Sequence, residues 1–244
     1  MEIVKPTPIL ALDVANVDEA MALVAELGDT CRFYKVGGEL FTAAGPDVVH
    51  RVRASGADVF LDLKYHDIPN TVRGAVRSAA ALGVRLVTVH AIGGEAMIRA
   101  AVEGAADRTR CGVLAVTLLT SLSEGEAASL WGRREEFRTK DEVLRLAEVA
   151  GQAGAVGVVC SGKEARVVKE RFGARLSVLI PGIRLAGTAG QDQARIVTPT
   201  EAAATGAEYV VVGRAVTAAA ERQRAMREVV EQLSGVRADT GSLA

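Results

Sequence analysis

Runs of consecutive apolar residues alternate along the chain with longer amphipathic segments. The apolar runs cover residues 8–14, 31–37, 57–64, 84–91, 112–119, 155–161, 175–183 and 207–214. Their apolar residues are successive rather than alternating, which is typical of strands that are covered on both faces. Between them, apolar side chains recur at spacings of three and four, which predicts helices over residues 17–27, 46–55, 71–82, 95–105, 140–153 and 162–172.

The order of these segments predicts the fold. Eight strand signals with helices between them indicate eight βα units, the number that closes an α/β barrel of the (β/α)8 TIM type. Helix C-cap glycines are expected where Gly precedes Ala or Val before a strand, at Gly56, Gly83, Gly154 and Gly206. The alternative is a doubly wound open sheet, but no GxGxxG follows the first strand. We therefore predict a single barrel domain over residues 1–234 and a flexible tail over 235–244.

Composition and charge limit the function classes. The 244 residues are 49% hydrophobic and 24% charged, as in a folded globular protein. Because 29 basic residues balance 30 acidic ones, we expect no general affinity for nucleic acid or an anionic membrane. No signal-like N-terminus or membrane-length apolar run is present, which predicts a cytoplasmic protein. Cys31, Cys111 and Cys160 lack metal-binding or CxxC spacing and are expected to be reduced core residues.

Ionisable residues follow the predicted strands at the end where barrel active sites lie. Asp13 ends the first strand, Lys35 stands in the second, and the third runs into Asp62 and Lys64. Strand alternation predicts that Asp62 and Lys64 point to the same side, into the barrel mouth. The alternative is a set of buried ion pairs that only stabilise the barrel. So many ionisable groups at one barrel end favour a catalytic site.

Two connections are longer than a helix and a turn require, over residues 121–142 and 183–200. Both leave the carboxyl ends of strands. The second is rich in Gly, Thr and Gln, so we expect a mobile loop that closes over a ligand.

A set of motifs resembles one enzyme family. The segment DLKYHDIPNTV follows ALD and KVGGELF and precedes VHA, LLTS, PGIR, DQxR and VVGRAVT. In this combination and order, from Ile9 to Thr217, the chain is similar to the orotidine 5′-phosphate decarboxylases of the bacterial type. DxKxxD alone is shared by a wider barrel superfamily, whereas the HDIPNT extension, KVG, PGIR and VVGR together are specific.

The resemblance implies a set of site residues. The catalytic residues would be Lys35, Asp62, Lys64 and Asp67, with Asp67 donated by the neighbouring subunit of a homodimer. The substrate-binding residues would be Asp13, Lys35, Ile68, Thr71, Thr120, Pro181, Arg184, Gln193, Gly213 and Arg214. Gln191 is the alternative to Gln193, because both lie in the loop AGQDQAR.

The implied reaction converts orotidine 5′-phosphate to uridine 5′-phosphate and carbon dioxide, the last step of de novo UMP synthesis, without cofactor or metal. The three scattered histidines also show no metal-binding pattern. Two alternatives remain open. One is a related DxKxxD barrel that binds magnesium, such as a keto-gulonate phosphate decarboxylase or a hexulose phosphate synthase. The other is a nucleotide-phosphate binder without activity.

Overall fold

The strands of the computed structural model, which describes residues 5–106, 110–133, 137–185 and 197–235, form a closed parallel barrel in the order β1 to β8. Their bounds are β1 Thr7–Ala11, β2 Phe33–Gly37, β3 Asp58–Tyr65, β4 Leu86–His90, β5 Gly112–Val116, β6 Gly157–Val159, β7 Ser177–Ile183 and β8 Tyr209–Val212. The barrel closes because β1 pairs with β8 as well as with β2. The predicted fold class is confirmed.

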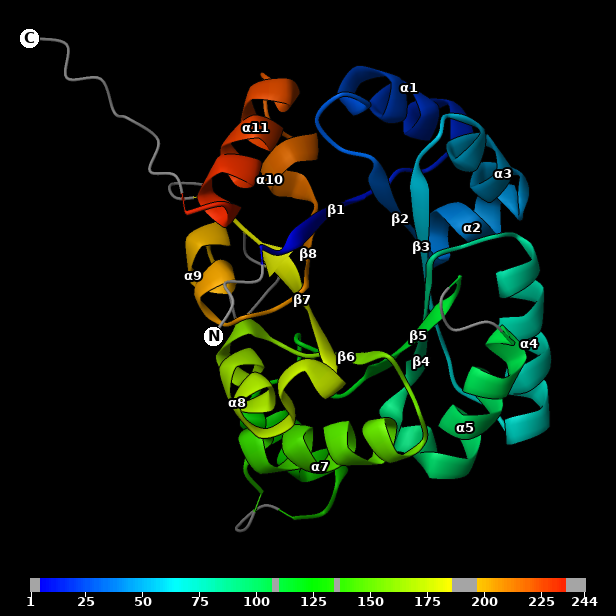
Figure 1. Ribbon diagram of the computed structural model, residues 1–244, viewed down its shortest axis with the longest axis vertical. Coiled ribbons are helices and arrows are strands. Elements are labelled where there is room, and N and C mark those ends of the chain that lie inside the picture. The colour runs from blue at the N-terminus through cyan, green and yellow to red at the C-terminus, as the bar shows by residue number, and fades with distance from the viewer. Residues whose placement is uncertain (1–4, 107–109, 134–136, 186–196, 236–244) are drawn as a thin grey trace, which may run out of the picture.

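The helices surround the barrel and cover the outer faces of its strands (Figure 1). Their bounds are α1 Val17–Leu27, α2 Gly38–Ala44, α3 Asp47–Ala54, α4 Pro69–Ala81, α5 Gly94–Ala105, α6 Glu124–Leu130, α7 Thr139–Gln152, α8 Gly162–Phe172, α9 Pro199–Ala204, α10 Arg214–Thr217 and α11 Arg222–Leu233, with the 3-10 turns η1 Ala91–Gly93 and η2 Gly173–Arg175. All six predicted helices occur. The long α11 was not predicted, although Met226, Val229 and Leu233 repeat at helical spacing and are buried.

The turns that lead from helices into strands contain the predicted glycines. Gly56, Gly83, Gly154 and Gly206 have φ of 82°, 75°, 88° and 81°. Each glycine directly follows the C-cap residue of a helix. Glycine adopts the left-handed backbone conformation needed there at little energetic cost. These C-cap predictions are confirmed.

The barrel has two apolar layers, as expected for strands buried on both faces. The outer layer packs the strands against the helices. The inner layer fills the barrel and consists of Ile9, Ala11, Phe33, Phe60, Leu86, Leu114, Val116, Val159, Leu179 and Val211. Inward positions beyond this layer therefore face the mouth at the carboxyl ends of the strands.

The three cysteines are free and buried, as predicted. Burial raises the pKa of the Cys111 thiol to about 11 and also raises the pKa of Cys31 and Cys160. These thiols are core residues without nucleophilic character. Within the described ranges, none of the helices has both the length and the apolar character needed to span a bilayer.

Candidate active site

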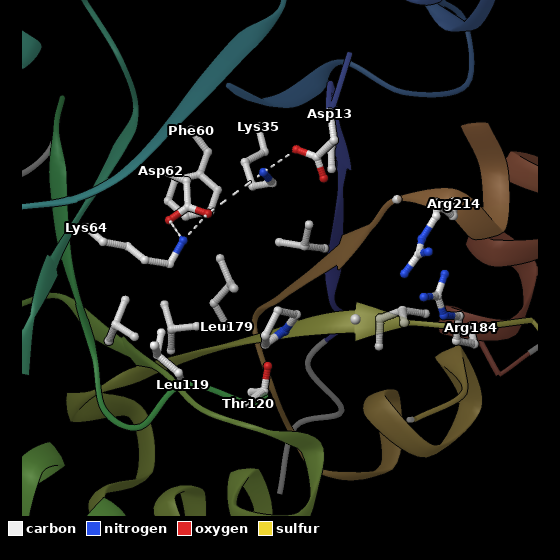
Figure 2. A pocket seen from close by; sticks show the side chains of 18 of the residues that line it. Asp13, Lys35, Phe60, Asp62, Lys64, Leu119, Thr120, Leu179, Arg184 and Arg214 are labelled. Carbon is white, nitrogen blue, oxygen red and sulfur yellow. Dashed lines mark hydrogen bonds and ion pairs between the residues drawn. The ribbon is translucent and has the colours of Figure 1, made fainter. Parts of the chain in front are cut away.

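A cavity of about 290 Å³ opens at the carboxyl ends of the strands. Figure 2 shows charged side chains from several strands extending into it. Of the predicted site residues, those lining this cavity are Asp13, Lys35, Asp62, Lys64, Thr120, Pro181, Arg184, Gly213 and Arg214. Side chains that lie far apart in the sequence are thus brought to one barrel mouth.

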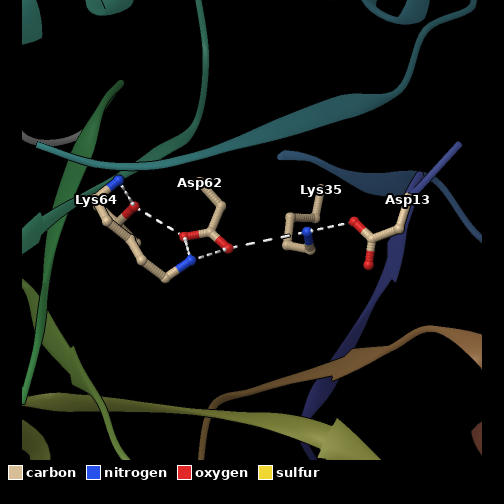
Figure 3. Close-up of polar contacts among 5 residues, drawn as sticks. Asp13, Lys35, Asp62 and Lys64 are labelled. Carbon is tan, nitrogen blue, oxygen red and sulfur yellow. Dashed lines mark hydrogen bonds and ion pairs between the residues drawn. The ribbon is translucent and has the colours of Figure 1, made fainter. Parts of the chain in front are cut away.

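One side of the cavity carries a row of charges that alternate in sign, here called the charge chain: Asp13, Lys35, Asp62 and Lys64 (Figure 3). Lys35 Nζ lies 2.7 Å from Asp13 Oδ1 and 3.9 Å from Asp62 Oδ2. Lys64 Nζ donates to both Asp62 oxygens at 2.8 Å. The side chains of Lys35 and Asp62 are only 12% and 13% exposed. Alternation of sign lets these largely buried charges compensate one another, whereas an unpaired charge there would be costly.

Asp62 and Lys64 meet through an irregularity in β3. Leu61 pairs with Val87 and Tyr65 pairs with Val89, so β3 advances four residues while β4 advances two. Lys64 has φ of 49°, in the left-handed region that residues other than glycine rarely adopt. Both side chains line the mouth, as strand alternation predicts. The bulge and the left-handed backbone at Lys64 were not predicted.

Gly37, at the end of β2, was not predicted as a site residue. A Cβ at this position would lie 2.9 Å from Lys35 Nζ and 3.5 Å from Asp13 Oδ1. The Lys35 side chain therefore folds back over the Gly37 backbone on its way to Asp13, a path that a larger residue would obstruct. The signal was present in the sequence as the small residue two positions after Lys35.

The opposite end of the cavity is cationic. Figure 2 shows the guanidinium groups of Arg184 and Arg214 at this end, well away from Lys64. Arg184 follows β7 and is only 7% exposed, and its backbone N–H donates to the Val197 carbonyl at 3.1 Å. Its Nε is buried and has no hydrogen-bond partner in the part of the chain that the structure describes. A buried guanidinium with an unsatisfied nitrogen is typical of an anion-binding position.

Gly213 and Arg214 join the last strand to the single helical turn α10. The turn begins at Arg214, and Gly213 is its N-cap. Gly213 has φ of −119° and ψ of −113°. Gly213 lines the cavity, and without a side chain it leaves the backbone open to a ligand.

Apolar side chains between the two ends were also missed by sequence reasoning. Phe60, Leu118, Leu119, Leu179 and Val211 line the cavity. Two of them carry a readable signal, because Phe60 stands two residues before Asp62 and Val211 two residues before Gly213. Positions two apart on a strand share a face. The apolar wall excludes water beside the charge chain, which strengthens its electrostatic interactions.

Three predicted residues do not reach the cavity of their own chain. Asp67, Ile68 and Thr71 are exposed at the start of α4, and the Ile68 side chain is 67% exposed. The Asp67 carboxylate accepts a hydrogen bond from the Ile68 backbone N–H at 2.6 Å. The predicted loop residue Gln193 and its alternative Gln191 lie outside the described residues.

Two histidines lie beside the charge chain. The rings of His66 and His90 are 5.7 Å apart between centroids. Burial lowers the pKa of His90, and the neighbouring His66 and Lys64 lower it further. His90 is therefore neutral at neutral pH and adds no further cation to the site. In the described ranges, no group of three or more His, Cys, Asp or Glu side chains is arranged to hold a metal ion.

The fold and this site define a class of protein: a (β/α)8 barrel enzyme whose mouth joins an alternating lysine–aspartate row to a pair of arginines. Residues 6–229 match the model of the orotidine 5′-phosphate decarboxylase / HUMPS family. The chain belongs to this family, and it is an enzyme of the carboxy-lyase class.

Similar proteins cover nearly the whole chain. An orotidine 5′-phosphate decarboxylase of Halorhodospira halophila is 48% identical over 94% of this chain and 96% of its own length. One from Nitrosococcus oceani is 44% identical over 93% and 97%. Among solved structures, orotidine 5′-phosphate decarboxylase from Lactobacillus acidophilus superposes with a TM-score of 0.81 at 36% identity, covering 94% of this chain and 99% of that one. The resemblance inferred from the motifs is confirmed.

Proposed function

We propose that this enzyme converts orotidine 5′-phosphate to uridine 5′-phosphate and carbon dioxide, the last step of de novo UMP synthesis. The relatives that share 42–48% of its residues carry the name of this activity. The observation that carries the proposal is how the charged groups are distributed in the cavity: two arginines lie at one end and the charge chain lies at the other. A nucleotide with a phosphate and a pyrimidine carboxylate has anionic groups at both ends.

The arginine end suits the phosphate. Arg184 and Arg214 present guanidinium groups that match phosphate oxygens, and Gly213 leaves the backbone open to a close anion. The buried Nε of Arg184, without a partner in the described residues, would gain one on binding. Thr120 and Pro181 line the cavity between the two ends and would contact the base. Asp13 and Lys35 would contact the ribose side.

The charge chain suits the chemistry of decarboxylation. The bond from C6 to the carboxylate breaks, its electron pair stays on C6, and carbon dioxide leaves. A proton from Lys64 Nζ then forms the new C6–H bond, and the neutral amine regains a proton from water. Asp62 holds the Lys64 ammonium with two hydrogen bonds of 2.8 Å, so the cation is in place before charge develops.

One cation cannot account for the whole acceleration. A unit charge about 4 Å from the developing anion contributes about 4 kcal/mol at an effective dielectric of about 20. Lowering a barrier by roughly 20 kcal/mol therefore needs the whole charge chain together with binding energy from the remote phosphate. No cofactor enters this scheme. Both Asp62 oxygens already accept hydrogen bonds from Lys64, an arrangement unlike that of a carboxylate that ligates magnesium.

We also propose a homodimer in which Asp67 completes the neighbouring subunit's site. Asp67, Ile68 and Thr71 are exposed and lie outside the cavity of their own chain. Ile68, just before α4, and Ile92, in η1, are 67% and 44% exposed and add apolar surface available to a second subunit. We place the enzyme in the cytoplasm, since its three cysteines are free.

The decisive experiment follows the loss of orotidine 5′-phosphate absorbance in buffer with and without EDTA. We expect turnover that EDTA leaves unchanged. Lys64→Ala is expected to abolish turnover and retain binding of uridine 5′-phosphate. Turnover that EDTA removes would indicate the metal-dependent alternative, and binding without turnover in the unaltered protein would indicate a non-catalytic binder.

The shared site has its own test. Lys64→Ala and Asp67→Ala proteins are each expected to be inactive. When their subunits exchange, each mixed dimer regains one site with both residues intact, so activity returns. If verified subunit exchange restored nothing, Asp67 would not act across the interface.

A further inference from the structure

The gap in the β3–β4 ladder leaves polar groups that need partners. Between the pairs Leu61–Val87 and Tyr65–Val89, β3 carries two more residues than β4 can match. Backbone groups in such a bulge lose their ladder partners. Lys64 lies in this bulge with its left-handed φ of 49°, a conformation that persists only where the surroundings hold it.

Thr88 of β4 fills this gap. It is fully buried, and its hydroxyl oxygen accepts a hydrogen bond from the Lys64 backbone N–H at 2.9 Å. The same hydroxyl lies 2.9 Å from Asp62 Oδ1 and donates to it. The direction is fixed by chemistry, because an ionised carboxylate can only accept and a backbone N–H can only donate. A hydroxyl, with one hydrogen and free lone pairs, satisfies both neighbours at once.

These contacts close a ring. The Lys64 backbone donates to Thr88, Thr88 donates to Asp62, and Asp62 accepts from the Lys64 ammonium. The same threonine thus holds both ends of Lys64, its backbone directly and its side chain through Asp62. It also gives the Asp62 carboxylate an uncharged donor besides Lys64, while Lys35 contributes an ion pair at 3.9 Å. That donor fixes the plane of the carboxylate between the two cations.

We propose that Thr88 is a positioning residue, which sets the left-handed backbone at Lys64 and the orientation of Asp62 and so holds the Lys64 ammonium in the cavity. The inference rests on the proposed function, because it assigns Lys64 as the proton donor. Thr88 does not line the cavity and acts only through its two neighbours. A valine would fill the same volume but would leave the Lys64 N–H and one Asp62 lone pair without this partner.

The test compares Thr88→Val and Thr88→Ser with a matched control, Thr117→Val. Thr117 is also a buried threonine, 2% exposed, just beyond the end of the next strand, and its hydroxyl donates to the Val159 carbonyl at 2.9 Å. It touches neither Asp62 nor Lys64 in the hydrogen bonds of the described residues. The control therefore removes a comparable hydrogen bond without changing the charge chain.

Values of kcat and KM are measured separately for decarboxylation, together with Tm. Thr88→Val is expected to lower kcat about 10- to 100-fold with KM changed by less than about threefold, since phosphate binding is untouched. Thr88→Ser restores kcat to within about threefold, and Thr117→Val leaves it within about twofold of the original. If Thr88→Val fails to fold, Thr88→Cys, which carries a much weaker donor, takes its place.

Two results would overturn the inference. One is a folded Thr88→Val protein with unchanged kcat. The other is an equal loss of kcat in Thr88→Val and Thr117→Val, which would show a general effect on stability. Failure of the proposed function is separate, because it shows as absent turnover in the unaltered protein.

Discussion

Adding one carbon atom at Gly37 should displace the Lys35 ammonium without disturbing the fold. Gly37 has φ of −94° and ψ of −179°, an extended conformation that alanine adopts freely. The new Cβ would lie 2.9 Å from Lys35 Nζ, so the ammonium must retreat by about 0.5 Å to reach an ordinary contact distance. The flexible lysine can move, but its partners Asp13 and Asp62 remain where they are.

The cost follows from the two distances. If Lys35 Nζ moves from 2.7 Å to about 3.2 Å from Asp13, their attraction weakens by about 1 kcal/mol at an effective dielectric of about 20. From 3.9 Å to about 4.4 Å, its attraction to Asp62 weakens by about 0.5 kcal/mol. An ammonium displaced in this way loses a similar amount of interaction with the bound transition state, so Gly37→Ala should lower kcat/KM for orotidine 5′-phosphate roughly tenfold, at about 1.4 kcal/mol per factor of ten.

The neighbouring residue offers the control. A Cβ at Gly38 meets nothing within 4 Å, and Gly38 is the first residue of α2. Gly38→Ala should leave kcat/KM unchanged and Tm unchanged or slightly raised, because alanine favours the helix. Steady-state kinetics and thermal denaturation of both proteins decide the matter. Equal kcat/KM in the two variants would refute the reasoning, and so would a loss of Tm in Gly37→Ala large enough to explain its activity.

Three further predictions concern other groups. Arg184→Met should raise Tm of the ligand-free protein by removing a buried cation, while weakening inorganic phosphate binding at least tenfold in calorimetry; unchanged phosphate affinity would contradict its role. Cys31, Cys111 and Cys160 should resist a thiol reagent at pH 8 and react fully in denaturant, and rapid labelling of the native protein would contradict their burial. Because burial lowers the pKa of His90 below 6.5, the unfolded chain takes up its proton first and the free energy of unfolding falls as pH drops below about 6.5. His90→Gln should flatten that decline in urea denaturation between pH 7.5 and 5.5, and an unchanged slope would assign it to other groups.

The sequence could predict the barrel because its signals are local and repeated. Each strand is a run of successive apolar residues, and each helix shows apolar residues at spacings of three and four. The cavity residues at strand ends could be found for the same reason, since Asp13, Lys35 and Asp62 are charges that interrupt apolar runs. Arg184, Gly213 and Arg214 depended on motif resemblance as well as on position.

What escaped prediction depends on contacts between neighbouring strands. The bulge at Lys64 is defined by how β3 pairs with β4, and no residue type within β3 indicates it. Thr88 stands in an apolar run as an ordinary β-branched residue, and its role follows from the hydroxyl reaching two groups of another strand. The role of Asp67 depends on a contact between two subunits, so it stays a prediction.

The bulge in β3 limits how this active site can be grafted onto another barrel. On a regular strand of another barrel, Asp62 and Lys64 would still share a face. Lys64 would lose the left-handed backbone that it has in the bulge, and with it the hydrogen bond from its N–H to a hydroxyl on the next strand. A graft must include two extra residues on one strand and a hydroxyl side chain on the next. The smallest segment that can be grafted therefore spans two adjacent strands.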